Sequence, residues 1–511
     1  MEFSQQDLKQ IKKQGLTLEE VNQQLEDFNN GFPYMWIVKP ATVGDGIRQY
    51  DDKQTAEFVK LYEDNKDKFT IMKFVPASGA ATRMMKDFYT FLSEYTDEES
   101  TPIDSFPKVK EAIDNIEKFA FHDLLVNCMD KAGISIEKCL KQKDYKTIIE
   151  FIVTDKGLNY GKYPKAWITF HANEDKSRLM TAFEQHLQEA AQYATSNDVA
   201  NLHFTVTEEH LEGFEKLKEE LVPIYEQKYK IKYNITFSFQ QHSTDTIAVN
   251  EDNTPFHDAN GNLVFRPSGH GALIKNLGKL DSDIIFIKNI DNISSCYQKK
   301  TVYYKELLAG VLIQTKQKVN NLMSKLKQTG LTKQELVSAA RTINKHLNIL
   351  DMQDHTQFPT LAAYKRYLRE LIERPIRVCG MVRNTGEPGG GPYFVKRGDE
   401  ESLQIVEMAQ ICMDSWKTKK IASRSTHFNP VDLVVSTKDF IGNKFSLKSF
   451  IDYQTGFISE KSYEGNTIKA MERPGLWNGA MAKWITIFVE VPLETFSPVK
   501  TLNDLLKNEH Q

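Results

Sequence analysis

The stretch Gly261–Asn292, GNLVFRPSGHGALIKNLGKLDSDIIFIKNIDN, joins a glycine-containing loop to a strongly apolar segment. Residues 265–271 predict a rigid loop whose glycines let the backbone approach a flat ligand closely. Residues 272–277 predict one or two turns of helix. After a polar break, residues 284–287 (IIFI) are a continuous run of β-branched and aromatic side chains. Such a run is typical of a central strand that is buried on both faces.

Polar residues directly follow this predicted strand. Asn289, Asp291 and Asn292 stand at its C-terminal end, where open α/β sheets bind their ligands. A carboxylate just downstream of a glycine loop suits a divalent cation that carries a nucleotide, so we predict Asp291 as a metal ligand. The alternative is a turn or a helix N-cap. The loop is not a dinucleotide-binding fingerprint, because Ile274 occupies the place of the third glycine.

A second strand, loop and helix are predicted around residue 80. Residues 69–75 (FTIMKFV) predict a strand, and the small-residue loop PASGAATR leads into a helix. This arrangement points backbone N–H groups at a phosphate, and Arg83 adds a fork of donors. We therefore predict nucleotide binding at Ala77, Ser78, Gly79 and Thr82. A tight turn is the alternative. The chain lacks a Walker A lysine pattern, which argues against P-loop chemistry.

Alternating helices and strands between residues 177 and 241 predict an α/β fold with a doubly wound, mixed but mostly parallel sheet. Thr17 and Thr332 each stand three residues before a glutamate, which is typical of a helix start. We expect a helical N-terminal cap at 1–65, although a partner-binding arm is the alternative. The main domain is expected at 66–498, with helical insertions at about 90–158 and 303–373 and a polar tail at 499–511.

A glycine-rich stretch, Gly386–Pro392, lies between two further predicted strands. So many glycines suggest that the backbone approaches a ligand closely, and a flexible surface loop is the alternative. Arg383 precedes the stretch and Glu387 lies within it; a phosphate favours an arginine, and sugar hydroxyls favour a carboxylate. The predicted sugar-phosphate pocket comprises Arg383, Glu387, Gly389, Gly390 and Asn478.

The composition is that of an ordinary globular chain. It has 511 residues, 40% hydrophobic and 26% charged, with a net charge of −4. A slightly negative net charge does not attract the phosphate backbone, so no nucleic acid partner is expected. No apolar run approaches the ~20 residues of a membrane span, and the N-terminus has no signal-peptide core. Five scattered cysteines without a C-x-x-C pair argue against disulfides and zinc. We therefore expect a cytoplasmic protein.

PSGHGALIKNL followed by IIFIKNIDN resembles the uridine-binding segment of the UDP-sugar pyrophosphorylases. The whole chain resembles a bacterial family of unknown function related to those enzymes. The resemblance implies a nucleotide-diphospho-sugar transferase-like fold. It also implies that Gln241, Gly269, His270 and Gly271 hold the nucleoside.

The phosphate loop of those enzymes, Gly-Gly-x-Gly-Thr-Arg, is matched here at Gly79, Thr82 and Arg83. Ser78 and Ala81 replace its first and third glycines, and any position that demands a positive φ would be strained there by alanine. In those families a Pro-Lys pair soon follows the loop. In this chain the resemblance assigns that role to Lys165, some eighty residues later, with Lys86 as the local competitor.

The resemblance predicts an enzyme, a sugar-phosphate nucleotidyltransferase. Its expected substrates are a nucleoside triphosphate, UTP first, and a sugar 1-phosphate, and its expected cofactor is Mg²⁺. The catalytic residues would be Arg83, Lys165 and Asp291. Two alternatives remain: a glycosyltransferase that uses a nucleotide sugar on the same fold, and a catalytically inactive nucleotide-binding protein.

Overall fold

The computed structural model describes residues 3–173, 178–351, 355–386, 389–398 and 400–511. Two compact units are present. The first comprises residues 1–70, 239–287 and 306–491, and the second comprises residues 71–238, 288–305 and 492–511. Each is described separately. Eleven strands of the described chain form a mixed, mostly parallel sheet, as the sequence predicts.

In the first unit the strand order is β2 (Thr42–Val43), β3 (Gly46–Arg48), β21 (Ile485–Glu490), β14 (Ile376–Arg383), β18 (Asp432–Ser436) and β12 (Ile284–Lys288). β14 runs parallel to β21 and antiparallel to β18. All five residues of β12 are buried, which confirms the central strand predicted from its apolar run. Continuous apolar sequence is needed here because both faces of the strand are covered.

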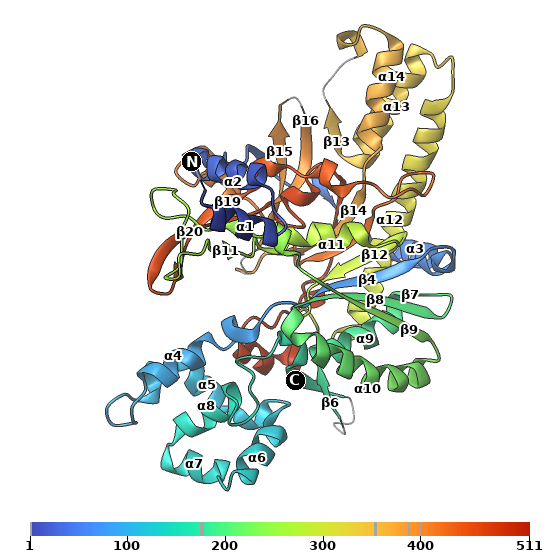
Figure 1. Cartoon of the computed structure of the whole chain (residues 1–511). Coiled ribbons are helices and arrows are strands. Elements are labelled where there is room, and N and C mark those ends of the chain that lie inside the picture. The colour runs from blue at the N-terminus through green and yellow to red at the C-terminus, as the bar shows by residue number, and fades with distance from the viewer. Residues whose placement is uncertain (1–2, 174–177, 352–354, 387–388, 399) are drawn as a thin grey trace. The chain divides into compact units, whose positions relative to one another are not determined.

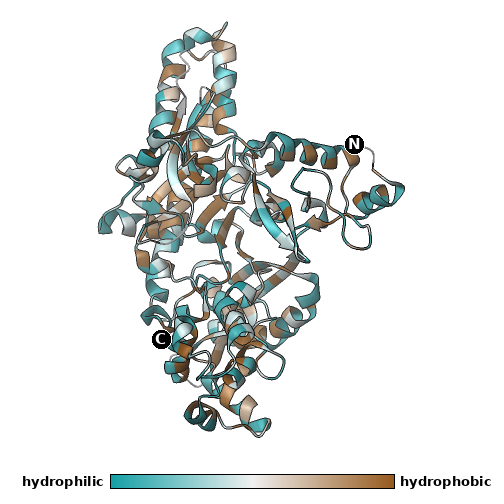
Figure 2. Ribbon diagram, turned by 90° about the vertical axis from the view of Figure 1, so that its left-hand side faces the viewer, coloured by the Kyte–Doolittle hydropathy of each residue, from teal (hydrophilic) through white to brown (hydrophobic). Residues whose placement is uncertain are grey.

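A smaller antiparallel sheet of the first unit has the order β1 (Ile37–Pro40), β15 (Gly391–Arg397), β16 (Glu400–Val406) and β13 (Ile349–Asp351). The unit also contains the helices α3 (Asp52–Glu63), α11 (Ile274–Lys279), α13 (Lys333–Leu347), α14 (Leu361–Ile372) and α15 (Trp416–Ala422), and most of α12 (Gln298–Lys327). α13 buries Leu336, Ala339, Ile343 and Leu347 at helical spacing. Figure 2 shows brown and teal residues on the same helices, as expected for such two-sided elements.

The N-terminal helices α1 (Gln5–Lys13) and α2 (Leu18–Asn30) begin at the capping boxes of Ser4 and Thr17. Their apolar sides form a common core with the short strand β10 (Thr246–Ile247) and with β20 (Asn466–Glu472). β10 pairs with β11 (Phe265–Arg266), and β20 pairs with β19 (Phe457–Tyr463). Residues 37–48 form strands that the helical pattern of residues 1–65 did not predict.

The second unit contains the parallel strands β4 (Ile71–Pro76) and β8 (Val199–Val206), with β7 (Thr195–Ser196) and β9 (Lys232–Phe239) beside β8. Its long helices are α9 (Ala182–Tyr193) and α10 (Leu211–Tyr229). Figure 1 shows a separate group of helices in blue and cyan. These are α4 (Lys86–Glu94), α5 (Pro107–Asp114), α6 (His122–Lys131), α7 (Ile136–Gln142) and α8 (Tyr145–Val153).

The segment predicted as a polar tail, 499–511, packs into the second unit. Val499, Leu502 and Leu505 are almost fully buried. His510, also buried, stacks on His171, and its Nδ1 lies 2.8 Å from the Nε2 of His171. Nδ1 of His171 donates to the Gln185 side-chain oxygen at 2.7 Å, so its Nε2 accepts the bond from His510. The His171 ring is therefore neutral in the fold.

This histidine pair predicts a loss of stability in acid. Burial lowers the pKa of His171 to about 4 and that of His510 to about 3, from 6.5. Below pH 6.5 the unfolded chain binds protons that the folded chain does not, so stability present at pH 7 is lost as the pH falls toward 4. Between pH 7 and pH 5 each histidine contributes about 2 kcal/mol of this loss.

His510→Gln keeps a donor for His171 and removes one titrating group. Urea unfolding at pH 7 and pH 5 should show that the free energy of unfolding falls by about 2 kcal/mol less in the variant than in the wild type. An identical fall in both proteins would contradict the assignment of His510 as a buried neutral group.

Among the described residues, no helix combines the length and the apolar character that crossing a membrane requires.

Candidate functional site

The predicted phosphate loop follows β4 and leads into α4. Its backbone is paired with the segment that carries Lys165: Ala80 forms an antiparallel bridge with Pro164. The N–H of Ala81 donates to the carbonyl of Tyr163 at 3.1 Å, and the N–H of Lys165 donates to the carbonyl of Gly79 at 3.3 Å. The structure thus brings together two segments that are some eighty residues apart in sequence.

The substitutions of glycine in this loop cause no backbone strain. None of the non-glycine residues in 77–83 has a positive φ, and Ala80 is extended with a φ of −66°. Ala81 begins a short 3-10 helix at residues 81–83, a conformation that alanine adopts freely. Thr82 and Arg83 are exposed, whereas Ala77 is buried and Ser78 is half-buried. No position in this loop therefore requires a left-handed backbone conformation.

Lys165 forms an ion pair with Asp291. Its Nζ lies 2.7 Å from the Oδ2 of Asp291, and both side chains are largely buried, at 14% and 19% exposure. Lys165 Nζ also donates to the carbonyl of Val499 at 2.9 Å. The ammonium group is thus fixed by two oxygens, one of them charged. Lys86, the competing lysine, is exposed at the start of α4.

The C-terminal segment completes the frame around this ion pair. The N–H of Val499 donates to the carbonyl of Asp291 at 3.0 Å, and Pro498 forms a bridge with Asn292. The side-chain oxygen of Asn292 accepts the N–H of Ser497 at 2.9 Å. The sequence offered no signal for these contacts, because they join positions about two hundred residues apart.

A buried charge network lies just before Asp291 in the same unit. The carboxylate of Glu189, on α9, accepts from Lys73 of β4 at 2.8 Å and from Lys288, the last residue of β12, at 2.6 Å. All three side chains are at most 5% exposed. Nε2 of His186 lies 3.1 Å from the carbonyl oxygen of Ile290, next to Asp291. The network therefore ties the end of β12 to α9 and β4.

Electrostatics within the network follow from burial. Burial alone would raise the pKa of Glu189, but the Lys288 and Lys73 ammonium groups outweigh it and hold that pKa well below its usual range. Burial lowers the pKa of Lys73 to about 7, although Glu189 opposes the shift. The carboxylate is therefore charged in the fold, and it is the group that makes two buried lysines tolerable.

In the first unit, the predicted base loop is packed against the chain after β20. Gly269 has a φ of +76°, a conformation that favours glycine. A Cβ on Gly271 would lie 2.1 Å from the carbonyl oxygen of Pro474. The requirement for glycine at position 271 is therefore already set by backbone packing within the chain.

His270 projects from this loop onto Trp477, with the ring centroids 4.0 Å apart and nearly parallel. Its Nδ1 accepts the N–H of Leu476 at 3.0 Å, so the proton of the neutral ring lies on Nε2. That Nε2 lies 3.7 Å from a carboxylate oxygen of Glu407. The same oxygen accepts from the Asn478 amide at 2.5 Å.

Glu407 is a residue that the sequence reasoning missed. His270, the largest influence, holds the pKa of the Glu407 carboxyl below its ordinary value. A Cβ on Gly390 would lie 3.9 Å from Glu407 and 3.7 Å from the side-chain oxygen of Asn478. Glu407 thus lies beside His270, which is predicted to bind the base, and beside Asn478, which is predicted to bind the sugar phosphate. It directly follows the buried end of β16, which is the signal that identified Asp291 after β12.

The other predicted residues lie as follows. Arg383 is exposed at the end of β14, with its Nε 3.4 Å from a Glu490 oxygen. Gln241 precedes a short 3-10 helix and accepts the Thr244 N–H with its carbonyl. A Cβ on Gly389 would contact Phe428, and one on Gly390 would lie 2.4 Å from Ile405. These glycines therefore make room for side chains of the same unit. Glu387 lies outside the described residues.

No group of three or more His, Cys, Asp or Glu side chains in the described part of the chain is arranged to hold a metal ion. Asp291 offers a single carboxylate. Mg²⁺ is commonly held by one or two carboxylates together with substrate phosphates, so a lone aspartate suits a cation that arrives with a nucleotide.

Comparisons with solved structures return sugar-nucleotide enzymes. The UDP-N-acetylglucosamine pyrophosphorylase of Trypanosoma brucei, solved with an inhibitor, has a TM-score of 0.50 at 11% identity, over 98% of this chain and 79% of that chain. A UDP-glucose pyrophosphorylase mutant of Leishmania major, solved with UDP-glucose, has a TM-score of 0.44 at 12% identity, over 99% and 79%. The first of these similarities supports the predicted α/β fold; at this identity it shows the fold alone.

A search of curated protein sequences gave no significant match. A family model described as a domain of unknown function (DUF4301) matches residues 4–511. The chain therefore belongs to the DUF4301 family, as its resemblance to a family of unknown function predicted.

Proposed function

We propose that this protein is a nucleotidyltransferase that forms a nucleotide sugar and pyrophosphate from a nucleoside triphosphate, UTP first, and a sugar 1-phosphate. The observation that carries the proposal is the convergence of the 77–83 loop, Lys165 and Asp291 within the second unit. The loop exposes a threonine and an arginine side chain, and its backbone pairs with the segment that carries the Lys165 ammonium group. This combination suits a chain of phosphates.

The reaction requires the sugar-phosphate oxygen to attack the α-phosphorus while pyrophosphate leaves. Such chemistry depends on in-line positioning and on neutralising charge, with little covalent participation by the protein. In this proposal Arg83 and Lys165 contact the β- and γ-phosphates, together with the amides of the loop. Asp291 would bind Mg²⁺, which neutralises charge on the phosphate oxygens.

The first unit supplies contacts of a different kind. The backbone of residues 269–271 and the side chain of Gln241 are proposed to hold the base. Glu407, held by His270 and Asn478, presents a carboxylate beside Gly390, and sugar hydroxyls are good donors to such a group. Arg383, Glu387 and Gly389 remain proposed contacts for the sugar phosphate.

Lys165→Met should weaken UTP binding about ten- to hundredfold, because one charge-assisted contact to phosphate is worth roughly 1.5–3 kcal/mol. Lys86→Met is the matched control, since Lys86 is exposed on α4 near the same loop. Isothermal titration in Mg²⁺ measures both affinities. Weaker binding in Lys86→Met with an unchanged Lys165→Met would transfer the role to Lys86.

Titration of the wild type with UTP, UDP and UMP separates the proposal from its alternatives. A binding site for pyrophosphate should bind UTP most tightly. UTP makes at least two charge-assisted contacts that UMP lacks, so its binding should be stronger than that of UMP by several kcal/mol. A glycosyltransferase has no use for a third phosphate, so UDP equal to or tighter than UTP would favour that activity. Failure to bind any nucleotide would contradict the proposal and both alternatives, because each of them requires a bound nucleotide.

A further inference from the structure

A small pocket of the first unit is lined in part by Gly271, the last residue of the 269–271 loop. It has a volume of about 40 Å³, whereas one water needs about 10–15 Å³. The space therefore suits a group the size of a phosphate and is too small for a nucleoside. Gly271, Ala272 and Pro474 form its wall on the side of the loop, and Ile451 and Tyr453 contribute an apolar side.

Three cationic side chains line this pocket, Lys275, Lys448 and Arg473. Within the described chain, none of them lies within 4 Å of a carboxylate. Lys275 Nζ donates to the Ser243 hydroxyl at 3.1 Å, and Nε of Arg473 donates to the Thr244 carbonyl at 2.9 Å. These partners are neutral, so three positive charges surround a space of phosphate size without a counter-ion.

The carboxylates that act electrostatically on Lys275 and Arg473 have other partners. Glu20 accepts the N–H and hydroxyl of Thr17 in the cap of α2. Asp245 accepts from Gln14 at 2.7 Å, and Asp27 accepts from Gln23. The cations also repel one another: burial lowers the pKa of Lys275, and Lys448 and Arg473 lower it further. An anion in the pocket would relieve both effects.

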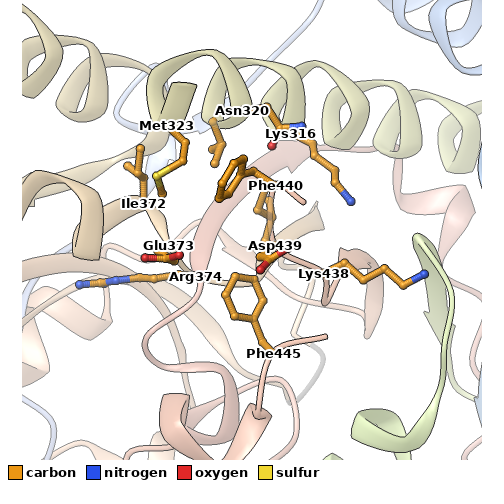
Figure 3. A pocket seen from close by; sticks show the side chains of 12 residues that line it. Lys316, Asn320, Met323, Ile372, Glu373, Arg374, Lys438, Asp439, Phe440 and Phe445 are labelled. Carbon is orange, nitrogen blue, oxygen red and sulfur yellow. The ribbon is translucent and has the colours of Figure 1, made fainter. Parts of the chain in front are cut away.

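A second pocket of the same unit shows what a neutralised arrangement looks like (Figure 3). Lys438 pairs there with Asp281 and Asp283 at 2.9 and 3.1 Å, and Arg374 pairs with Glu400 at 2.8 Å. Lys316 donates to a serine hydroxyl, as Lys275 does. Two aspartates and one lysine act electrostatically on Lys316, whereas one carboxylate, that of Glu20, acts on Lys275 against three cations. The charges around this second pocket are balanced within the chain, so the pocket does not require a bound anion.

We propose that the pocket of Lys275, Lys448 and Arg473 is a binding site for a phosphate group, carried by inorganic phosphate or by a small phosphorylated metabolite. Arg473 offers the guanidinium fork that matches phosphate oxygens, and the lysines add point charges. Because Gly271 and Ala272 form one wall, an anion bound there stabilises the 269–271 loop. This site stands independently of the proposed nucleotidyl transfer.

Isothermal titration of the full chain with inorganic phosphate, in a chloride buffer at pH 7 without nucleotide, tests the site. The wild type should bind phosphate saturably, and Lys448→Met, a change of an exposed side chain that leaves the fold intact, should weaken binding several-fold. Lys275→Met and Arg473→Lys should weaken it about tenfold or more, as expected for loss of a charge-assisted contact. Lys316→Met is the matched control and should bind as the wild type does.

Repeating the titration with glucose 1-phosphate and with sulfate distinguishes the sources of the anion. Tighter binding of the sugar phosphate, still weakened by Lys448→Met, assigns the pocket to a phosphorylated metabolite; equal or weaker binding assigns it to inorganic phosphate. Sulfate that binds as tightly as either would mean a nonspecific anion site and would overturn the proposal. Absence of saturable binding, or binding unchanged in Lys275→Met and Lys448→Met, would also overturn it. None of these outcomes depends on nucleotide turnover.

Discussion

Replacing Asp291 by alanine will lower kcat/KM for pyrophosphate formation by about a thousandfold, a loss of about 4 kcal/mol of transition-state stabilisation. The carboxylate is the group proposed to hold Mg²⁺, and it is also the partner that fixes Lys165 at 2.7 Å. Its removal therefore affects both the cation and the lysine. Steady-state assays with NTP, sugar 1-phosphate and Mg²⁺ measure the effect.

Asp291→Asn is the matched variant, because it keeps the shape and an oxygen for Lys165 but removes the charge. We expect nearly the same loss of activity. Either variant leaves the largely buried Lys165 without its counter-charge, so the free energy of unfolding should fall by about 1–3 kcal/mol. Full activity in Asp291→Asn would remove the carboxylate from the proposed chemistry. Unfolding of both variants would instead assign Asp291 a structural role.

The largest expected change in stability is at Glu189. Glu189→Gln should lower the free energy of unfolding by about 3–5 kcal/mol, because it leaves Lys73 and Lys288 buried without a counter-charge. The double variant Glu189→Gln/Lys73→Met should recover part of this loss, since it removes one of the uncompensated charges. Denaturant unfolding followed by circular dichroism measures each protein.

The control is Lys60→Ala, which breaks the exposed ion pair between Lys60 and Asp64 on α3. Exposed pairs contribute about 0–1 kcal/mol, so this variant should unfold close to the wild type. A Glu189→Gln protein that is no less stable than Lys60→Ala would show that the buried network does not contribute the expected stability.

The local parts of the fold could be predicted from the sequence. The apolar run at 284–287 forms a buried strand, and Thr17 and Thr332 cap helices with the glutamate three residues later, because these signals depend on near neighbours. The strands within residues 37–48 could not be predicted from local sequence. β1 and β3 form by pairing with segments far along the chain, which include Tyr393 and Phe488.

The same difference between local signals and long-range pairing applies to the candidate site. Asp291 is a candidate because of its place after a strand, whereas Lys165 is a candidate only through the family resemblance. The structure shows a long-range backbone pairing between the Lys165 segment and the 77–83 loop. The Val499 contacts cannot be predicted from local sequence, because they depend on tertiary pairing alone. Glu407 does carry a local signal, since it directly follows the buried end of β16. The glycines at 271 and 390 are accounted for by packing within the chain, which no local pattern separates from a ligand contact.

The most direct test of the central claim is the release of pyrophosphate from an NTP in the presence of a sugar 1-phosphate. The purified protein is incubated in Mg²⁺ with each of four NTPs and a panel of sugar 1-phosphates, and pyrophosphate is detected by a coupled assay, with Asp291→Asn as the control. We expect release that requires both substrates, is highest with UTP and is lost in Asp291→Asn. No release above the level of Asp291→Asn with any pair, from a folded protein, would contradict the proposed function.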